Sequence, residues 1–111
     1  MTQITHWING ALDTKKPERT GDIYNPATGK VTGTVAFGNA ATVDSAVSAA
    51  TAAFAEWRHS SLTKRTQVLF AFRELVAQNK EKIAALITAE HGKVLSDAAG
   101  EVTRGLEVVE F

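Results

Sequence analysis

The spacing of apolar residues changes character near Thr42. Before that point, short apolar runs alternate with turn residues, and His6-Trp7-Ile8 is followed by Asn9-Gly10, a dipeptide typical of tight β-hairpins. Asp22-Ile23-Tyr24 and the β-branched run 31–35 flank a turn-rich segment, NPATG. The pattern predicts two or three short strands, the first of them paired through the Asn9-Gly10 turn.

After Thr42 the apolar spacing becomes helical. One stripe recurs every three or four residues, as on a single helix face, and consists of Val43, Ala46, Val47, Ala50, Ala53, Phe54 and Trp57. Thr42 is the expected N-cap of this helix. Asp44 is expected in the first turn, where a negative charge suits the helix dipole.

Three further helices are predicted. The second begins near Thr63, and Asn79 separates it from the third and caps that helix. Gly92 ends the third helix, and the fourth begins near Ser96. The side chains expected in the core are Val68, Leu69, Phe72, Leu75, Val76, Ile83, Leu86, Ile87 and the aromatic Trp7, Tyr24, Phe54 and Trp57. We therefore predict an α+β fold, with short strands over residues 1–41 and four helices over residues 42–111.

Composition and charge remove several classes of function. The chain has 111 residues, 44% of them hydrophobic and 22% charged, which is enough for one domain with a modest core. Its 12 basic and 12 acidic side chains balance, so no general attraction to nucleic acid or anionic membranes is expected. The absence of cysteine excludes a disulfide scaffold, a thiolate metal site and a cysteine nucleophile within these residues. The N-terminus lacks the features of a signal peptide and no run approaches the ~20 apolar residues of a membrane span, so we expect a cytoplasmic protein.

Few polar residues have the spacing of a catalytic or metal site. His6, His59 and His91 are far apart and have no second ligand at metal spacing, so no metal site is predicted. Gly92-Lys93 lacks the upstream glycine and the following hydroxyl residue of a phosphate-binding loop. A salt-bridged helix edge, rather than acid–base catalysis, explains the carboxylates Glu90, Glu101, Glu107 and Glu110.

Arg104 is the residue that the sequence singles out. In the fourth helix Val102 centres an apolar face, and Arg104 points nearly the opposite way, on a face that includes Gly100 and Phe111. A solvated face gains nothing from Phe111 or from a glycine, which costs roughly 1 kcal/mol relative to alanine in a helix. This face is therefore expected to pack against something, and a guanidinium there can bind a carboxylate bidentately. The alternative, which spacing alone favours, is a surface ion pair with Glu101 or Glu107, worth about 0.2–0.5 kcal/mol.

Several segments resemble aldehyde dehydrogenases. Ile8-Asn9-Gly10, the NPATGKV segment at 25–31 and the alanine-rich helix ending in AFAEWR at 53–58 are similar to the N-terminus of that superfamily. Residues 63–93, which close in His-Gly-Lys, resemble the family's next helices. The segment DAAGEVTRGLEVVEF, residues 97–111, resembles the methylmalonate-semialdehyde dehydrogenase branch, which is CoA-dependent and acylating.

The resemblance covers essentially all of the chain and departs at Val94, where threonine is common in many relatives. It implies that residues 42–111 are the helical part of an incomplete NAD-binding, Rossmann-like α/β domain, preceded by the short-strand region 1–41. Enzymes of this branch oxidise malonate and methylmalonate semialdehyde with NAD and CoA to acetyl-CoA or propionyl-CoA, NADH and carbon dioxide or bicarbonate. Their nucleophilic cysteine, nucleotide-binding motifs and oligomerisation strands would all lie beyond residue 111.

The resemblance also implies a role for Arg104. In this branch an arginine in a V-x-R-G segment is thought to hold the substrate carboxylate, and that arginine matches Arg104. A semialdehyde with a distal carboxylate must be distinguished from neutral aldehydes, and a bidentate guanidinium provides that distinction. No catalytic, cofactor-binding or metal-binding residue is expected within this segment.

The chain stops in the middle of the fourth helix, so we expect a piece of something larger. The resemblance implies that the complete enzyme is homo-oligomeric, a dimer or tetramer. Its expected partner is a small semialdehyde, not nucleic acid or a membrane. The alternatives are another aldehyde dehydrogenase, of the succinate-semialdehyde or betaine-aldehyde type, or a truncated helical module without catalysis. Alone, the segment is expected to be inactive, to bind neither NAD nor CoA, and to be poorly stable because apolar helix faces are uncovered.

Overall fold

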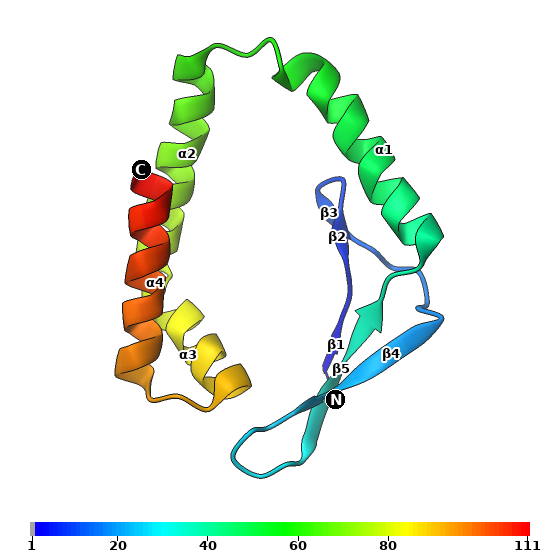
Figure 1. The fold of residues 1–111 in the computed structure, drawn as a ribbon, viewed down its shortest axis with the longest axis vertical. Coiled ribbons are helices and arrows are strands. Elements are labelled where there is room, and N and C mark those ends of the chain that lie inside the picture. Colours follow the sequence, from blue (N-terminus) through cyan, green and yellow to red (C-terminus); the bar gives the residue numbers. More distant parts are fainter. Residues whose placement is uncertain (1) are drawn as a thin grey trace. The chain divides into compact units, whose positions relative to one another are not determined.

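The computed structural model describes residues 2–111, which fall into two units. The first unit comprises residues 2–24 and Gly29–His59, and the second comprises Asn25–Thr28 and Ser60–Phe111. Over the described residues, short strands precede four helices, which confirms the predicted α+β order (Figure 1). The change from strand to helix falls between Phe37 and Ala40, where the sequence pattern also changes.

In the first unit, a small hairpin follows the opening strand. β2 (Trp7–Ile8) pairs antiparallel with β3 (Ala11–Leu12), with Trp7 opposite Leu12. The two residues of the turn, Asn9 and Gly10, have φ of 54° and 77°. Asparagine and glycine adopt such left-handed backbone most readily, which is why this dipeptide closes two-residue hairpins. The predicted hairpin is therefore confirmed.

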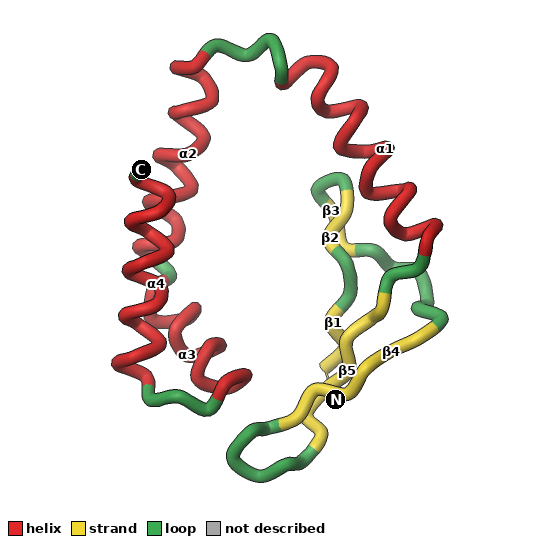
Figure 2. Tube along the Cα trace, in the orientation of Figure 1, coloured by secondary structure: helices red, strands yellow, loops and turns green. Residues whose placement is uncertain are grey.

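A three-stranded sheet has the order β1-β5-β4 (Figure 2). β4 (Arg19–Tyr24) and β5 (Val31–Phe37) are antiparallel, and a register shift between Ile23 and Tyr24 lies beside the predicted NPATG turn. β1 (Thr2–Ile4) pairs with β5 in parallel. The sequence reading missed β1, because three residues are too few to show an alternating pattern and its pairing partner lies about thirty residues away.

The first helix, α1 (Ala40–Trp57), begins with a reciprocal capping box. The amide of Thr42 donates to Asn39 Oδ1 at 3.0 Å, and the amide of Asn39 donates to Thr42 Oγ1 at 3.4 Å. The N-cap is therefore Asn39, and the expectation that Thr42 caps the helix and that Asp44 lies in its first turn was wrong. The shift has a physical reason, since both residue types cap helices and here the two act together.

Three helices form most of the second unit. They are α2 (Leu62–Gln78), α3 (Lys80–His91) and α4 (Leu95–Glu110). Asn79 separates α2 from α3 as predicted, but its side chain donates to the Leu75 carbonyl at 2.8 Å and makes no cap on α3. Gly92 ends α3 in the left-handed conformation at φ 83°, which confirms the predicted C-cap.

The core of the second unit lies where α3 packs on α4, and α4 also runs alongside α2 (Figure 1). Ala84 of α3 and Ala98 of α4 are completely buried, and these small side chains let the two helices approach closely. Val102 and Leu106 continue the buried face of α4, which confirms the apolar face predicted around Val102.

Most of the other predicted core positions are exposed. No residue of α1 or α2 is buried, and large apolar side chains remain at least 42% exposed; they are Trp7, Tyr24, Phe54, Trp57, Val68, Leu69, Phe72, Leu75 and Leu86. The expectation that these side chains form the core was wrong for residues 2–111. Apolar spacing identifies the face that a helix can bury, and the described residues supply no cover for these faces. None of the helices described over residues 2–111 has the length and apolar character needed to traverse a bilayer.

Candidate functional site

Arg104 is the only basic residue of α4. Ala98, Val102 and Leu106 face the core, and Arg104 lies on the exposed side of the same helix. A methyl group built on Gly100, one turn earlier, would lie 3.7 Å from Arg104 Nη1. The guanidinium thus extends back along α4 over the glycine, as long helical side chains do. Alanine at position 100 would touch the guanidinium without a clash, so glycine leaves this edge of Arg104 open.

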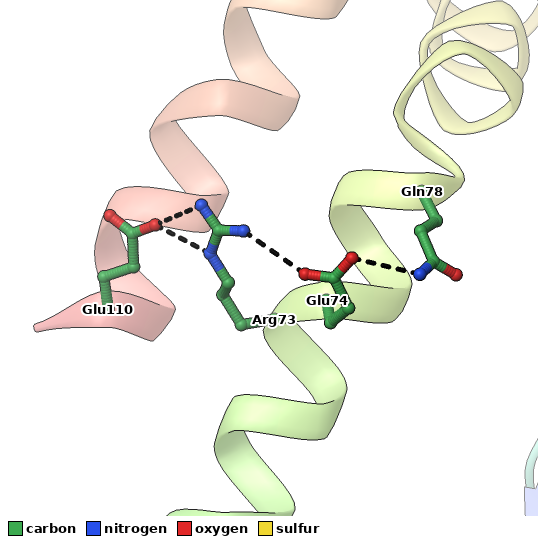
Figure 3. Close-up of polar contacts among 4 residues, drawn as sticks. All are labelled: Arg73, Glu74, Gln78 and Glu110. Carbon is green, nitrogen blue, oxygen red and sulfur yellow. Dashed lines mark hydrogen bonds and ion pairs between the residues drawn. The ribbon is translucent and has the colours of Figure 1, made fainter.

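Three cations from neighbouring segments are engaged with polar groups of α4. Arg73 of α2 binds Glu110, with Nε at 2.8 Å and Nη2 at 2.7 Å from the same carboxylate oxygen (Figure 3). Lys80, at the start of α3, donates to Thr103 Oγ1 at 2.7 Å. Lys93, in the turn before α4, forms an ion pair with Glu101. Together these contacts tie α4 to the preceding helices along its length.

Arg73 also extends the polar network along α2. Its Nη1 lies 3.7 Å from Glu74 Oε2, and Gln78 Nε2 donates to Glu74 Oε1 at 3.0 Å (Figure 3). All of these side chains are substantially exposed, so each pair contributes little to the free energy of unfolding. Their consequence is positional, because Arg73 fixes the carboxylate of Glu110 beside α2.

The ion pair with Lys93 determines the electrostatic environment of Glu101, the carboxylate three residues before Arg104. The hydrogen bond from Lys93 lowers the pKa of Glu101 below its ordinary value of 4.5, and this outweighs the partial desolvation that raises it. The positive charges of Lys93, Arg104 and His91 lower the pKa of Glu101 further. Glu101 is therefore ionised at neutral pH, and its partner is Lys93.

Arg104 makes no ion pair within the described part of the chain, 2–111. The alternative in which it pairs with Glu101 or Glu107, three residues before and after it, was wrong. Glu101 is bound by Lys93, and Glu107 is exposed and makes no ion pair among the described residues. The helix therefore presents a guanidinium with unused donors beside a glycine.

The face that carries Arg104 is open within the described chain. Arg104, Glu107 and Phe111 are all exposed, so the packing partner expected for this face is not found among residues 2–111. A neighbouring pocket of about 330 Å³ between α3 and α4 is lined by Glu81, Ala84, Leu95, Ser96 and Ala99, and Arg104 is not among its lining residues. Within residues 2–111 an anion would therefore meet Arg104 as an exposed guanidinium, outside this pocket.

The histidines and carboxylates that were considered as possible functional residues do not form a second site among the described residues. No group of three potential metal ligands occurs among the residues described. His91 lies in the last turn of α3, where a positive charge suits the helix dipole, as predicted. Glu101 and Glu110 form the salt-bridged helix edge expected from the sequence, whereas Glu90 and Glu107 form no ion pair among the described residues. The sequence reading missed Lys93 as the partner of Glu101, because a pair eight residues apart across a glycine turn has no helical period.

Comparison with known proteins identifies the family of this chain. The model of the aldehyde dehydrogenase family matches residues 13–111. The chain belongs to the aldehyde dehydrogenase family. It is 43% identical over 111 residues to a malonate-semialdehyde dehydrogenase of Pseudomonas aeruginosa, an alignment that covers 100% of this chain and 22% of the relative.

Two solved structures agree with this assignment to the aldehyde dehydrogenases. A methylmalonate-semialdehyde dehydrogenase from Oceanimonas doudoroffii is 44% identical with a TM-score of 0.95, and the match covers 99% of this chain and 22% of that one. A candidate methylmalonate-semialdehyde dehydrogenase from Sinorhizobium meliloti 1021, solved with NAD, is 39% identical with a TM-score of 0.95. That match covers 100% of this chain and 23% of the solved one. This aldehyde dehydrogenase chain thus spans about a fifth of the length of the relatives it matches.

Proposed function

We propose that this chain is the N-terminal part of a CoA-acylating methylmalonate- or malonate-semialdehyde dehydrogenase, in which Arg104 binds the carboxylate of the substrate. In that reaction the semialdehyde is oxidised with loss of its carboxylate, and the product is propionyl-CoA or acetyl-CoA. The likeness to enzymes of this name supports the reaction, and the geometry around Arg104 supports the role of the residue.

One observation carries the proposed role of Arg104. Arg104 makes no ion pair among the described residues, and Glu101, its most favourable partner on the helix, is already bound to Lys93. A substrate carboxylate can then meet a fork of free N–H donors without displacing a protein carboxylate. Displacement would cost part of the binding free energy, so an unpaired arginine is the better arrangement for selecting an acid substrate.

The exposure of Arg104 bears on where this site would be completed. In water a single arginine–carboxylate pair is weak, so selectivity requires that other residues surround the pair and lower the local dielectric. The open face around Gly100 and Arg104 gives room for such residues. We propose that the remainder of the enzyme covers this face and makes the pocket.

NAD and CoA are proposed for the complete enzyme and not for this segment. Residues 1–111 contain no glycine-rich nucleotide-binding motif and no cysteine nucleophile, so they do not fit either group. In enzymes of this branch NAD accepts a hydride and the CoA thiol takes the acyl group. We propose that residues 42–111 form the helical part of an NAD-binding domain, with 1–41 as its short-strand region, in a cytoplasmic homo-oligomer.

The proposal is tested in an active enzyme that carries residues 1–111 as its N-terminal segment. Such an enzyme is obtained from a longer coding sequence or by grafting this segment onto the Pseudomonas aeruginosa relative. Arg104→Leu is expected to raise KM for malonate semialdehyde by about 100-fold, since a charge-assisted bidentate contact in a closed site is worth about 3 kcal/mol. Steady-state kinetics with malonate semialdehyde and with propanal, a neutral aldehyde of equal length, measure the effect.

Two comparisons make the kinetics specific. Activity with propanal should change little in Arg104→Leu, because propanal has no carboxylate. Arg104→Lys should restore only part of the loss, because an ammonium group cannot reproduce the planar fork. Unchanged selectivity between the two aldehydes in Arg104→Leu would refute the proposed role.

A further inference from the structure

The surroundings of Arg104 contain two carboxylates that compete for its guanidinium. Glu101 stands three residues before it and Glu107 three residues after it on α4. Pairs at this spacing form readily on helices, and the order with the acid on the N-terminal side is the more favourable one. Glu101 is therefore the stronger competitor, and an Arg104–Glu101 pair would occupy the donors proposed to bind substrate.

Lys93 removes this competitor. Its ammonium group forms an ion pair with Glu101 Oε1, and its side chain is only 19% exposed, against 39% for Glu101. The two charges are thus partly withdrawn from water, which strengthens their attraction relative to a fully solvated pair. Glu101 and Arg104 remain electrostatically coupled but form no ion pair.

The backbone before α4 fixes the position of Lys93. Gly92 holds φ at 83°, a conformation that side chains rarely adopt. A methyl group built on Gly92 would also lie 3.1 Å from Pro26, so the glycine is packed as well as left-handed. Gly92 therefore fixes the direction in which the chain leaves α3. From the turn that follows, the side chain of Lys93 reaches Glu101 in the second turn of α4.

We propose that Lys93 is a positioning residue, which binds Glu101 and thereby keeps the guanidinium of Arg104 available for the carboxylate of the substrate. This inference rests on the proposed function of Arg104. It assigns Lys93 no contact with substrate, and its effect should be confined to acid substrates. It also predicts that the need for Lys93 disappears when Glu101 no longer carries a charge.

The experiment uses the same active enzyme and the same two aldehydes. Lys93→Met is expected to lower kcat/KM for malonate semialdehyde by roughly two- to threefold, mainly through KM, and to leave propanal oxidation nearly unchanged. Lys93→Met combined with Glu101→Gln is expected to restore the selectivity for malonate semialdehyde. Lys82→Met is the matched control, because among residues 2–111 Lys82 has a long contact of 3.4 Å to Asn79 Oδ1 and no carboxylate partner.

The outcomes separate this inference from the proposed function. If Arg104→Leu leaves selectivity unchanged, both proposals fall. If Arg104→Leu abolishes selectivity and Lys93→Met does not reduce it, only the role of Lys93 is overturned. A loss in Lys93→Met that affects both aldehydes equally, or that the double variant does not restore, indicates a structural or direct role and also overturns it.

Discussion

The helices α1 and α4 are held by opposite kinds of interaction. α1 has a complete capping box between Asn39 and Thr42, yet it buries none of its residues. α4 has no side-chain cap at Val94, yet it buries Ala98, Val102 and Leu106 and makes polar contacts with α2 and α3. Local sequence therefore specifies where α1 begins, whereas packing within the segment holds α4 in place.

This difference explains why the position of Arg104 is fixed within so short a segment. The face of α4 opposite Arg104 is packed on α3, so the rotation of the helix is fixed by buried side chains. With the rotation fixed, Arg104, Gly100 and Glu101 have definite positions. On α1 the rotation of the helix is not fixed in this way among the described residues, because α1 has no buried face. The direction of a functional side chain on α1 would therefore not be defined within this segment.

The largest expected difference in helix stability comes from replacing one valine by alanine in each helix, Val102 in α4 and Val47 in α1. Val102 is 6% exposed and Val47 is 58% exposed. Val102→Ala should lower the opening free energy of α4 by about 2 kcal/mol, through lost burial and a residual cavity. Val47→Ala should change that of α1 by less than about 0.5 kcal/mol.

Amide hydrogen exchange of this chain measures both opening free energies residue by residue. Equal losses in the two variants would contradict the contrast between α1 and α4. The contrast is sharpened in the complete enzyme, where we expect the apolar stripe of α1 to be covered. There, Val47→Ala should destabilise α1 by an amount similar to that of Val102→Ala in α4.

A smaller effect is expected from exchanging the cap chemistry of the two helices. Val94 has φ of −65° and ψ of 149°, an extended conformation suited to an N-cap. Val94→Thr should stabilise α4 by about 0.5–1 kcal/mol, because its hydroxyl can accept from an unpaired amide of the first turn. The reciprocal Thr42→Val should destabilise the start of α1 by a similar amount, because it removes half of the capping box.

Exchange rates of the first-turn amides in each helix provide the measurement. Unchanged exchange at the start of α4 in Val94→Thr would contradict the prediction and show that packing had already fixed a geometry that a cap cannot improve.

The smallest expected effect concerns pH. The pKa of Glu101 in the folded chain is lowered, chiefly by its hydrogen bond with Lys93. A lowered carboxyl pKa means that the stabilising contribution is complete above the ordinary value near 4.5 and is lost as pH falls through the folded value. In Lys93→Met the pKa of Glu101 should rise. Carbon NMR of the Glu101 carboxyl during an acid titration gives both midpoints, and an unchanged midpoint would remove Lys93 as the cause.

The sequence predicted the order of elements and the positions of several turns. Asn9-Gly10 and Gly92 carry their conformational requirement in their own chemistry, so both turns were predictable. The buried face of α4 was also predictable, since Val102 centres an apolar face with helical period. Core membership of Phe54, Trp57 and Phe72 was not, because burial depends on a partner surface and not on the helix alone.

The site was predictable only in part. The helical period of 3.6 residues placed Arg104 on the side of the helix opposite Val102. The same period placed Gly100 on the same face as Arg104. The choice of partner for Glu101 did not follow, because Lys93 reaches it across a turn between two helices. Spacing within one helix favoured an Arg104–Glu101 pair, and the turn geometry decided against it.

The most direct test of the central claim is a crystal structure of the complete enzyme with 3-hydroxypropionate. This compound keeps the carboxylate and the chain length of malonate semialdehyde and replaces its reactive aldehyde with an alcohol. We predict two hydrogen bonds of about 2.7–2.9 Å from the Arg104 guanidinium to the ligand carboxylate, with Lys93 still bound to Glu101. A carboxylate bound elsewhere, with Arg104 paired to Glu101 or Glu107, would contradict the claim.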